Sequence, residues 1–280
     1  MGQSGRVRPA PRRVVRVAAL VGVVLALSGC SAELTDQLKR LGLPEPASEE
    51  TPLIGDLWIG IWIAAFVVGV LVWGLILWSA VVYRRRSDEL PVQTRYNMPI
   101  EFLYTVTPIV IIAVIFLFTI DHQDELLDTS QEPDHTVEVI GQQWAWTFNY
   151  VDEDVYEVGT TTETTTLYLP IDQTVQLNLE SPDVIHSFWV PSFYMKMDVI
   201  PGHHNSFQVT PNNEGTFAGK CAELCGAYHS RMLFNVVVVS ESEYAEKIQE
   251  LRDAGQTGQV EAPIRGAYSE TPLNEAGSEQ

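Results

Sequence analysis

Residues 57–86 read LWIGIWIAAFVVGVLVWGLILWSAVVYRRR, an apolar run without a charge that stops at three arginines. A helix needs about 20 apolar residues to cross the hydrocarbon core of a bilayer, and this run is long enough. A second run, residues 102–120, is also free of charge and ends at Asp121. The sequence therefore predicts a hairpin of two membrane helices, residues 57–83 and 100–120, joined by a short loop at residues 84–99.

Basic residues indicate the orientation of this hairpin. The loop between the two apolar runs contains Arg84, Arg85, Arg86 and Arg95. Short loops rich in arginine and lysine stay on the cytoplasmic side of a membrane. We therefore expect the loop to be cytoplasmic and both ends of the chain to lie outside.

The first 29 residues are typical of a secretion signal. They contain five arginines and no acid, followed by an apolar stretch at residues 17–27 that is too short to span a bilayer. Ser28-Gly29-Cys30 then resembles the bacterial lipoprotein processing site, at which the cysteine is lipidated and becomes the new N-terminus. A plain signal peptide with an incidental cysteine is the alternative. We expect a signal at residues 1–29, a lipidated Cys30, an extracytoplasmic segment at residues 30–56, and a location in the bacterial plasma membrane.

The charge of the chain is strongly negative. Its 36 acidic and 17 basic residues give a formal net charge of −19. Such a surface repels nucleic acid and attracts basic partners. A solubilising surface or adaptation to salt would produce the same composition.

The residues after the second apolar run have the pattern of a β domain. Short β-prone segments at residues 135–140, 144–150, 164–169, 175–179, 205–210 and 233–239 are separated by turn signals. This pattern fits a small antiparallel β-sandwich or barrel at residues 121–240. Residues 241–254 have helical character. Residues 255–280 are rich in Gly, Pro, Ser and Glu, a composition typical of a flexible tail.

The segment with the most chemical information is residues 221–232, CAELCGAYHSRM. It contains two thiols, an imidazole and a thioether, at Cys221, Cys225, His229 and Met232. His186 lies upstream, and folding of a sandwich can bring it to the same end. Soft sulfur ligands with imidazoles suit copper or zinc, and a thioether favours copper. There is one more cysteine than a blue-copper site needs, and two thiolates can bridge two copper ions that share one electron.

Two other interpretations of this segment remain open. Cys221 and Cys225 could form a disulfide in an exported protein. The same cysteines with a histidine could also bind zinc. Neither interpretation uses both His186 and Met232.

These residues, with the apolar hairpin before them, resemble cytochrome c oxidase subunit II over residues 57–239. The loop is similar to the binuclear copper (CuA) loop of that family, Cys-x-Glu-x-Cys-x-x-x-His-x-x-Met. The resemblance implies a two-helix transmembrane hairpin followed by an all-β, cupredoxin-like domain. It also implies two copper ions held by a set of six residues, with Glu223 contributing its backbone carbonyl: His186, Cys221, Glu223, Cys225, His229 and Met232. The Glu223 side chain would help bind a magnesium ion shared with the catalytic subunit.

The same resemblance gives roles to two further residues. Trp144, in Gly141-Gln142-Gln143-Trp144-Ala145-Trp146, matches the aromatic patch where electrons arrive from cytochrome c. A tryptophan that packs in the core is the alternative. Glu101 is similar to the family glutamate at the mouth of a proton path. An acid placed there for the helix dipole is equally compatible with the sequence.

The resemblance implies a subunit that takes electrons singly from a c-type cytochrome. It would pass them to the haem-copper catalytic subunit, which reduces oxygen to water with proton translocation. The chain lacks Cys-x-x-Cys-His, so it has no covalent c-type haem site. Competing functions are a copper-delivery lipoprotein, a quinol-oxidase relative, which would lack the copper ligands, and a nitrous-oxide reductase, which would need another large domain.

Acidic residues lie beyond the aromatic patch and after Met197. In the implied fold we expect them to surround Trp144 above the copper pair and to attract the basic electron donor: Asp152, Glu153, Asp154, Glu157 and Asp198.

Overall fold

The computed structural model describes residues 32–90, 92–160 and 162–261. It divides into two compact units, Met1–Pro44 and Glu45–Gln280. In the first unit, a short helix that the sequence did not predict, α2, spans Ala32–Lys39. The predicted signal and Cys30 lie outside the described residues, as does most of the predicted tail.

The second unit begins with the two predicted apolar helices. α3 spans Thr51–Val82 and α4 spans Met98–Leu126. Both are longer than predicted, because the helical backbone continues beyond the apolar runs at the start of α3 and at the end of α4. Neither helix has a buried residue in its most apolar window, so they are not core helices of the β domain.

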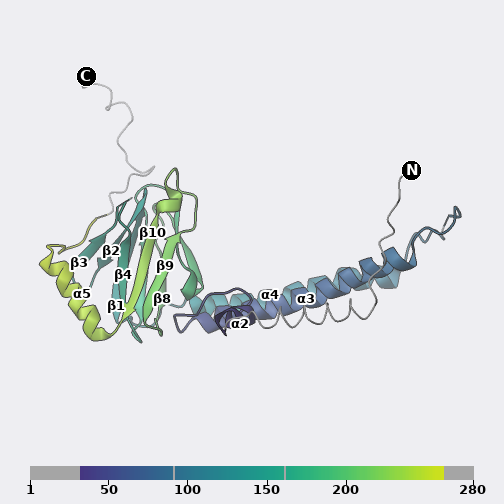
Figure 1. Cartoon of the computed structure of the whole chain (residues 1–280), viewed down its shortest axis with the longest axis horizontal. Coiled ribbons are helices and arrows are strands. Elements are labelled where there is room, and N and C mark those ends of the chain that lie inside the picture. Colours follow the sequence, from purple (N-terminus) through teal and green to yellow (C-terminus); the bar gives the residue numbers. More distant parts are fainter. Residues whose placement is uncertain (1–31, 91, 161, 262–280) are drawn as a thin grey trace, which may run out of the picture. The chain divides into compact units, whose positions relative to one another are not determined.

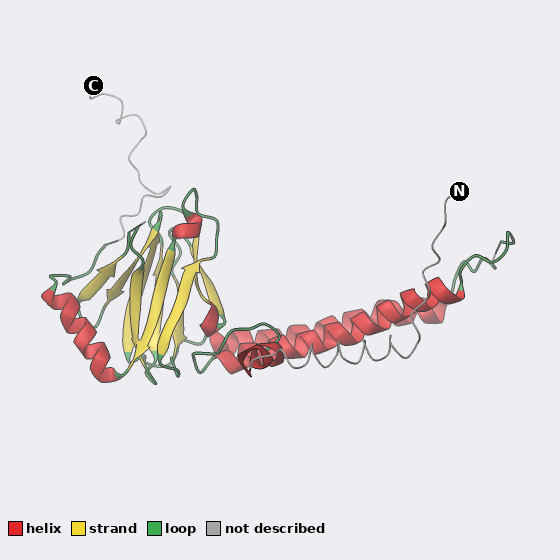
Figure 2. Ribbon diagram, viewed as in Figure 1, coloured by secondary structure: helices red, strands yellow, loops and turns green. Residues whose placement is uncertain are grey.

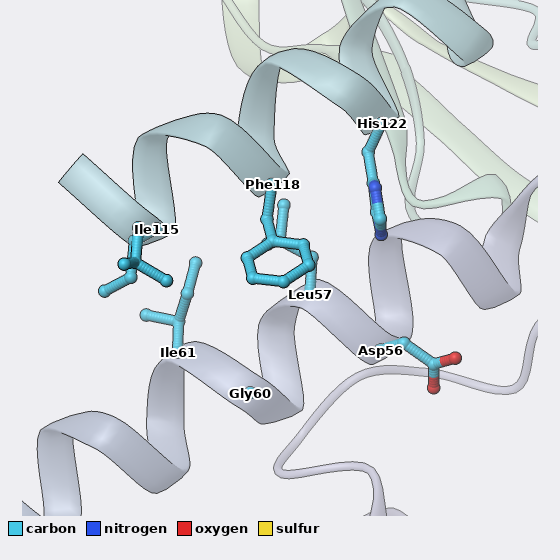
Figure 3. Close-up of a pocket in the computed structure, with 8 residues that line it drawn as sticks. Asp56, Leu57, Gly60, Ile61, Ile115, Phe118 and His122 are labelled. Carbon is cyan, nitrogen blue, oxygen red and sulfur yellow. The ribbon is translucent and has the colours of Figure 1, made fainter. Parts of the chain in front are cut away.

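The two helices face each other where α3 begins and α4 ends. Figure 3 shows Phe118 and His122 projecting from α4 toward α3, where Leu57 and Ile61 point back, while Asp56 points away. A groove of about 410 Å³ lies between these residues, and Gly60 contributes no side chain to it. Most of the side chains that line this groove between the two helices are apolar, and His122 is a polar exception.

The rest of the second unit is a two-layer β-sandwich (Figures 1 and 2). One sheet has the strand order β3-β2-β1-β5-β8, and the other has the order β4-β10-β9-β6-β7. The strands of the first sheet are β1 (His135–Gln142), β2 (Ala145–Tyr150), β3 (Val155–Val158), β5 (Val175–Glu180) and β8 (Asn205–Val209). Those of the second are β4 (Thr165–Pro170), β6 (His186–Val190), β7 (Met195–Val199), β9 (Gly215–Cys221) and β10 (Leu233–Val239).

The predicted fold class, a two-helix hairpin followed by an all-β domain, is confirmed. The expectation of purely antiparallel sheets is wrong, because β1 pairs with β5 in parallel and β10 pairs with β4 in parallel. Alternating apolar residues report which face of a strand is buried, and they carry no information on strand direction.

Aromatic side chains fill the space between the two sheets. Phe188 of β6 stacks on Phe234 of β10, with ring centroids 4.7 Å apart. Trp146 of β2 meets both rings edge-on, at 5.7 and 5.3 Å. All three residues are buried. This core joins β2 of the first sheet to β6, which begins at His186, and to β10, which begins directly after Met232.

A helix and a polar cluster close the end of the sandwich where β1 starts. α5 spans Glu241–Asp253 and starts at a capping box formed by Ser240 and Glu243. Its Tyr244 hydroxyl donates to Glu153 Oε1 at 3.1 Å. The same carboxylate lies 2.7 Å from His135 Nδ1. These contacts fix α5 to the β1 end of the domain.

Candidate metal centre

Three strands bring the predicted ligands to one end of the sandwich. β6 begins at His186 and β9 ends at Cys221, and the two strands are neighbours, with Phe188 opposite Cys221. β10 begins at Leu233, directly after Met232. The loop between β9 and β10 must therefore turn back over the start of β6.

The sulfur atoms lie at the centre of the cluster. Cys221 Sγ and Cys225 Sγ are 3.9 Å apart. His186 Nδ1 lies 3.8 Å from Cys221 Sγ, and His229 Nδ1 lies 3.5 Å from Cys225 Sγ. Each thiol therefore faces the other and has one imidazole beside it.

Two further donors complete the group. Met232 Sδ lies 3.8 Å from Cys225 Sγ, and the carbonyl oxygen of Glu223 lies 3.2 Å from Cys221 Sγ. All six predicted donor residues thus lie together. Cys221, Cys225 and Met232 are buried and His186 is fully buried.

Asp183 fixes the orientation of His186. Its Oδ1 lies 2.9 Å from His186 Nε2, so the Nδ1 atom faces Cys221. Asp183 also accepts hydrogen bonds from the backbone N–H groups of Gln143 and Val184. Histidine ligands commonly have such a partner on the second ring nitrogen. Asp183 was not predicted from the sequence, although an acid three residues before a ligand histidine was a usable signal.

The two thiols differ in acidity without metal. Burial opposes ionisation of Cys221, but hydrogen bonds with His186 and with backbone groups outweigh burial and lower its pKa. Burial and the adjacent Cys221 sulfur raise the pKa of Cys225. A positive ion between the two sulfurs would favour the thiolate form of both.

The donor set decides between the interpretations left open by the sequence. Cys221 and Cys225 are both free thiols here, and their separation is well beyond a disulfide bond. Two thiolates, two imidazoles, a thioether and a carbonyl exceed the four ligands of a structural zinc site. Sulfur-rich donors with a thioether fit copper.

We call the segment from Cys221 to Met232, between β9 and β10, the metal loop. Trp144 is half-buried and lies against this loop. Its ring meets the ring of Tyr228 edge-on, with centroids 5.0 Å apart and planes at 87°. The neighbouring Gln143 donates from Nε2 to the carbonyl oxygen of Cys225 at 2.7 Å. Neither Gln143 nor Tyr228 was predicted, because both contacts join segments far apart in sequence.

Exposed apolar side chains collect around the donors. Among the described residues 135–240, six large hydrophobic side chains are exposed, and five lie within two positions of a donor residue: Val184, Ile185, Leu224, Tyr228 and Leu233. The sixth is Val158. Clustered apolar exposure marks an interaction surface. We call these five residues the apolar collar.

The placement expected for Asp152, Glu153 and Asp154 is wrong. They lie in the turn after β2, whereas Trp144 immediately precedes that strand. Because β2 is a continuous strand, the turn lies at the opposite end of the sandwich from Trp144. Asp152 accepts from the Thr136 N–H at 2.7 Å, and Glu153 contacts His135 and Tyr244.

The other two acids differ from these three. Glu157 lies within β3 opposite Phe148, partway along the strand. Asp198 of β7 lies opposite Ser187, next to the register pair of His186 and Val199. Asp198 is therefore at the metal end of the sandwich.

Glu101 and the Glu223 side chain have simpler surroundings. Glu101 Oε1 accepts from the backbone N–H of Asn97 at 2.9 Å, and the Asn97 side chain caps the start of α4. This hydrogen bond contributes to capping the start of α4 and leaves both interpretations of Glu101 open. Glu223 is exposed, so its carboxylate is accessible to a partner.

Comparison with known proteins agrees with this geometry. Residues 37–121 match the transmembrane domain of cytochrome c oxidase subunit II, and residues 159–240 match its periplasmic domain. A probable cytochrome c oxidase subunit 2 of Streptomyces avermitilis is 48% identical over 92% of both chains. The chain belongs to the cytochrome c oxidase subunit II family.

Other relatives are more distant. The cytochrome c oxidase subunit 2 of Mycobacterium tuberculosis is 34% identical, covering 93% of this chain and 87% of that one. The solved periplasmic domain of subunit II of cytochrome oxidase from Bradyrhizobium japonicum is 27% identical, covering 44% of this chain and 97% of that domain, with a TM-score of 0.42.

Membership of this family confirms the predicted kind of protein, a subunit of cytochrome c oxidase. The chain is a membrane protein and a subunit of a haem-copper terminal oxidase. Family membership excludes two functions that the sequence left open, a copper-delivery protein and a nitrous-oxide reductase. The family's periplasmic domain implies CuA copper, and the residues gathered around Cys221 and Cys225 fit that metal.

Proposed function

We propose that this subunit receives single electrons from a c-type cytochrome and delivers them to the haem-copper catalytic subunit. The observation that carries this proposal is the pair of facing thiols, 3.9 Å apart, with an imidazole beside each. When bound there, a copper pair would supply reversible uptake of one electron at a time.

The residues around the donor atoms would keep the geometry of the site constant when the charge of a bound copper pair changes. Asp183 holds His186 in one orientation, and Gln143 holds the carbonyl of Cys225. Cys221, Cys225 and Met232 are buried, which limits contact with water. A fixed, dry site minimises the reorganisation that accompanies each electron transfer.

Trp144 is our candidate for the contact through which electrons arrive from the donor. Its indole lies beside the loop that carries Cys225 and His229, and part of it remains accessible. A covalent connection through Gln143 and one hydrogen bond then leads to Cys225. This route needs no movement of the chain.

Several finer features remain part of this proposal. The family relationship supports a magnesium ion near the Glu223 carboxylate, and a proton path that begins near Glu101. The arginine-rich loop at residues 84–99 supports a copper domain outside the plasma membrane. A signal at residues 1–29 and lipidation at Cys30 rest on the sequence alone. Mass spectrometry of the mature chain tests them, since they require a lipidated Cys30 at its start.

The proposal is tested by stopped-flow reduction of the copper-loaded, full-length chain by a reduced c-type cytochrome. Trp144→Gln should keep the copper spectrum and donor affinity but slow electron transfer within the bound complex by orders of magnitude. Trp189→Gln is the matched control, because Trp189 is also half-buried but contacts Lys220 instead of the loop. Equal internal rates in wild type and Trp144→Gln would contradict the proposed route.

A further inference from the structure

The indole of Trp144 is held between two parts of the metal loop. Tyr228 contacts it edge-on. Gly226 approaches it so closely that an added Cβ would lie 3.1 Å from both Cζ2 and Nε1 of the indole. Gly226 also has a φ of +128°, which favours glycine. The loop backbone and the Tyr228 ring therefore both restrict the indole.

Among the described residues, none forms a hydrogen bond that orients this indole. Trp144 Nε1 is buried and has no partner among the described residues. Buried tryptophan N–H groups usually have one. The direction of the ring is therefore set by packing, and Tyr228 is the aromatic side chain that packs on it.

Tyr228 is also suited to contact a partner. It is 46% exposed and belongs to the apolar collar, while the guanidinium of Arg231 lies 5.5 Å from its ring centroid. Tyr228 directly precedes His229, so the ring is attached to the backbone of a donor residue. Tyr228 thus belongs to the metal loop, packs against Trp144 and is partly exposed to solvent.

We propose that Tyr228 is a positioning residue for electron transfer, which holds the Trp144 indole against the loop of Cys225 and His229 and adds its exposed edge to the donor contact surface. This inference rests on the proposed function. In the step concerned, the reduced donor loses one electron and the copper centre gains it. Tyr228 is neither oxidised nor reduced, and its effect is on distance and orientation.

The positioning part is tested without metal or donor. The full-length, metal-free chain in detergent is labelled with 5-fluorotryptophan, and the fluorine resonance of Trp144 is identified by its loss in Trp144→Phe. Tyr228→Leu should shift and broaden this resonance, because the ring beside the indole is removed. Tyr228→Phe should leave it near its wild-type position. Tyr156→Leu, which removes a half-buried tyrosine from β3, is the matched control and should have no effect.

The functional part is tested with copper and a reduced c-type cytochrome. Tyr228→Leu should keep the copper spectrum and reduce the internal transfer rate by up to about 100-fold, as a misplacement of about 1 Å can do. Tyr228→Phe, which keeps the aromatic ring, should have the internal transfer rate of the wild type. An unchanged rate in Tyr228→Leu would overturn the inference, whether or not the resonance moves. A slower rate with an unmoved resonance would also overturn it, since positioning would not be the cause.

Failure of this inference is distinguishable from failure of the proposed function. If Trp144→Gln transfers electrons as fast as wild type, electrons do not arrive through Trp144, and the proposed route itself is wrong. If Trp144→Gln is slow and Tyr228→Leu is not, only the role of Tyr228 is wrong.

Discussion

Asp183 Oδ1 lies 2.9 Å from His186 Nε2, while Nδ1 of the same imidazole faces the Cys221 sulfur at 3.8 Å. The carboxylate thus selects the nitrogen that is presented to a metal. The Asp183 carboxylate also accepts a hydrogen bond from the backbone N–H of Gln143, the residue before Trp144. The His186 imidazole and the Gln143 backbone are therefore both hydrogen-bonded to Asp183.

This relationship predicts the effect of Asp183→Asn on copper binding. The amide keeps the size of the side chain but loses the charge that favours one imidazole tautomer. Loss of such a partner typically weakens metal binding by about 10- to 100-fold. Titration of the full-length chain against a copper chelator measures the change. Asp172→Asn, in the turn between β4 and β5, is the control, and equal affinities in both variants would show that Asp183 has no orienting role.

Gly219 should be intolerant of a side chain. A Cβ at this position in β9 would lie 2.1 Å from the Phe234 ring, which is part of the stacked core. Gly219→Ala should therefore lower the free energy of unfolding by about 1–3 kcal/mol, as overpacking does. It should also reduce the copper bound per chain, because Cys221 follows two residues later. Thermal unfolding and metal analysis check this, with exposed Ala218→Ser as control. Wild-type stability would refute the close approach.

The pair of His135 and Glu153 makes stability depend on pH. The hydrogen bond to Glu153 is the main cause that raises the pKa of His135 above its ordinary value near 6.5. A raised folded pKa gives stabilisation that is complete below the unfolded pKa and disappears as pH rises through the folded pKa. The stability difference between wild type and His135→Gln should therefore be larger at pH 5.5 than at pH 8.5. Chemical unfolding at both values measures it, and a pH-independent difference would be inconsistent with this pair.

Acids at the two ends of the sandwich should have different effects on donor binding. Asp198 lies at the metal end, so Asp198→Asn should weaken donor affinity and reduce its dependence on salt. Asp152→Asn removes the same charge at the opposite end, beyond the screening length of about 8–10 Å at ordinary salt. It should leave the salt dependence unchanged. Stopped-flow binding across ionic strengths distinguishes the two, and equal slopes would indicate that Asp198 only adds solubility.

The sequence predicted the parts of this molecule that have local signals. Charge-free runs identified both membrane helices, and the spacing from Cys221 to Met232 identified the metal loop. Strands β3, β6, β7 and β9 were not predicted, because they are short or lack clear alternation. The expected positions of Asp152, Glu153 and Asp154 were wrong, although the signal was local: these acids follow the strand that Trp144 precedes, and the two ends of one strand lie far apart. The contacts of Asp183, Gln143 and Tyr228 depend on chain segments that meet only after folding.

We expect the facing thiols of Cys221 and Cys225 to hold two copper ions that share one electron. Electron spin resonance of the copper-loaded, full-length chain tests it most directly. Two coppers per chain and an unpaired electron coupled equally to both copper nuclei are the expected result, with this signal lost in Cys221→Ser and in Cys225→Ser. One copper per chain, with the hyperfine pattern of a single copper nucleus, would contradict it.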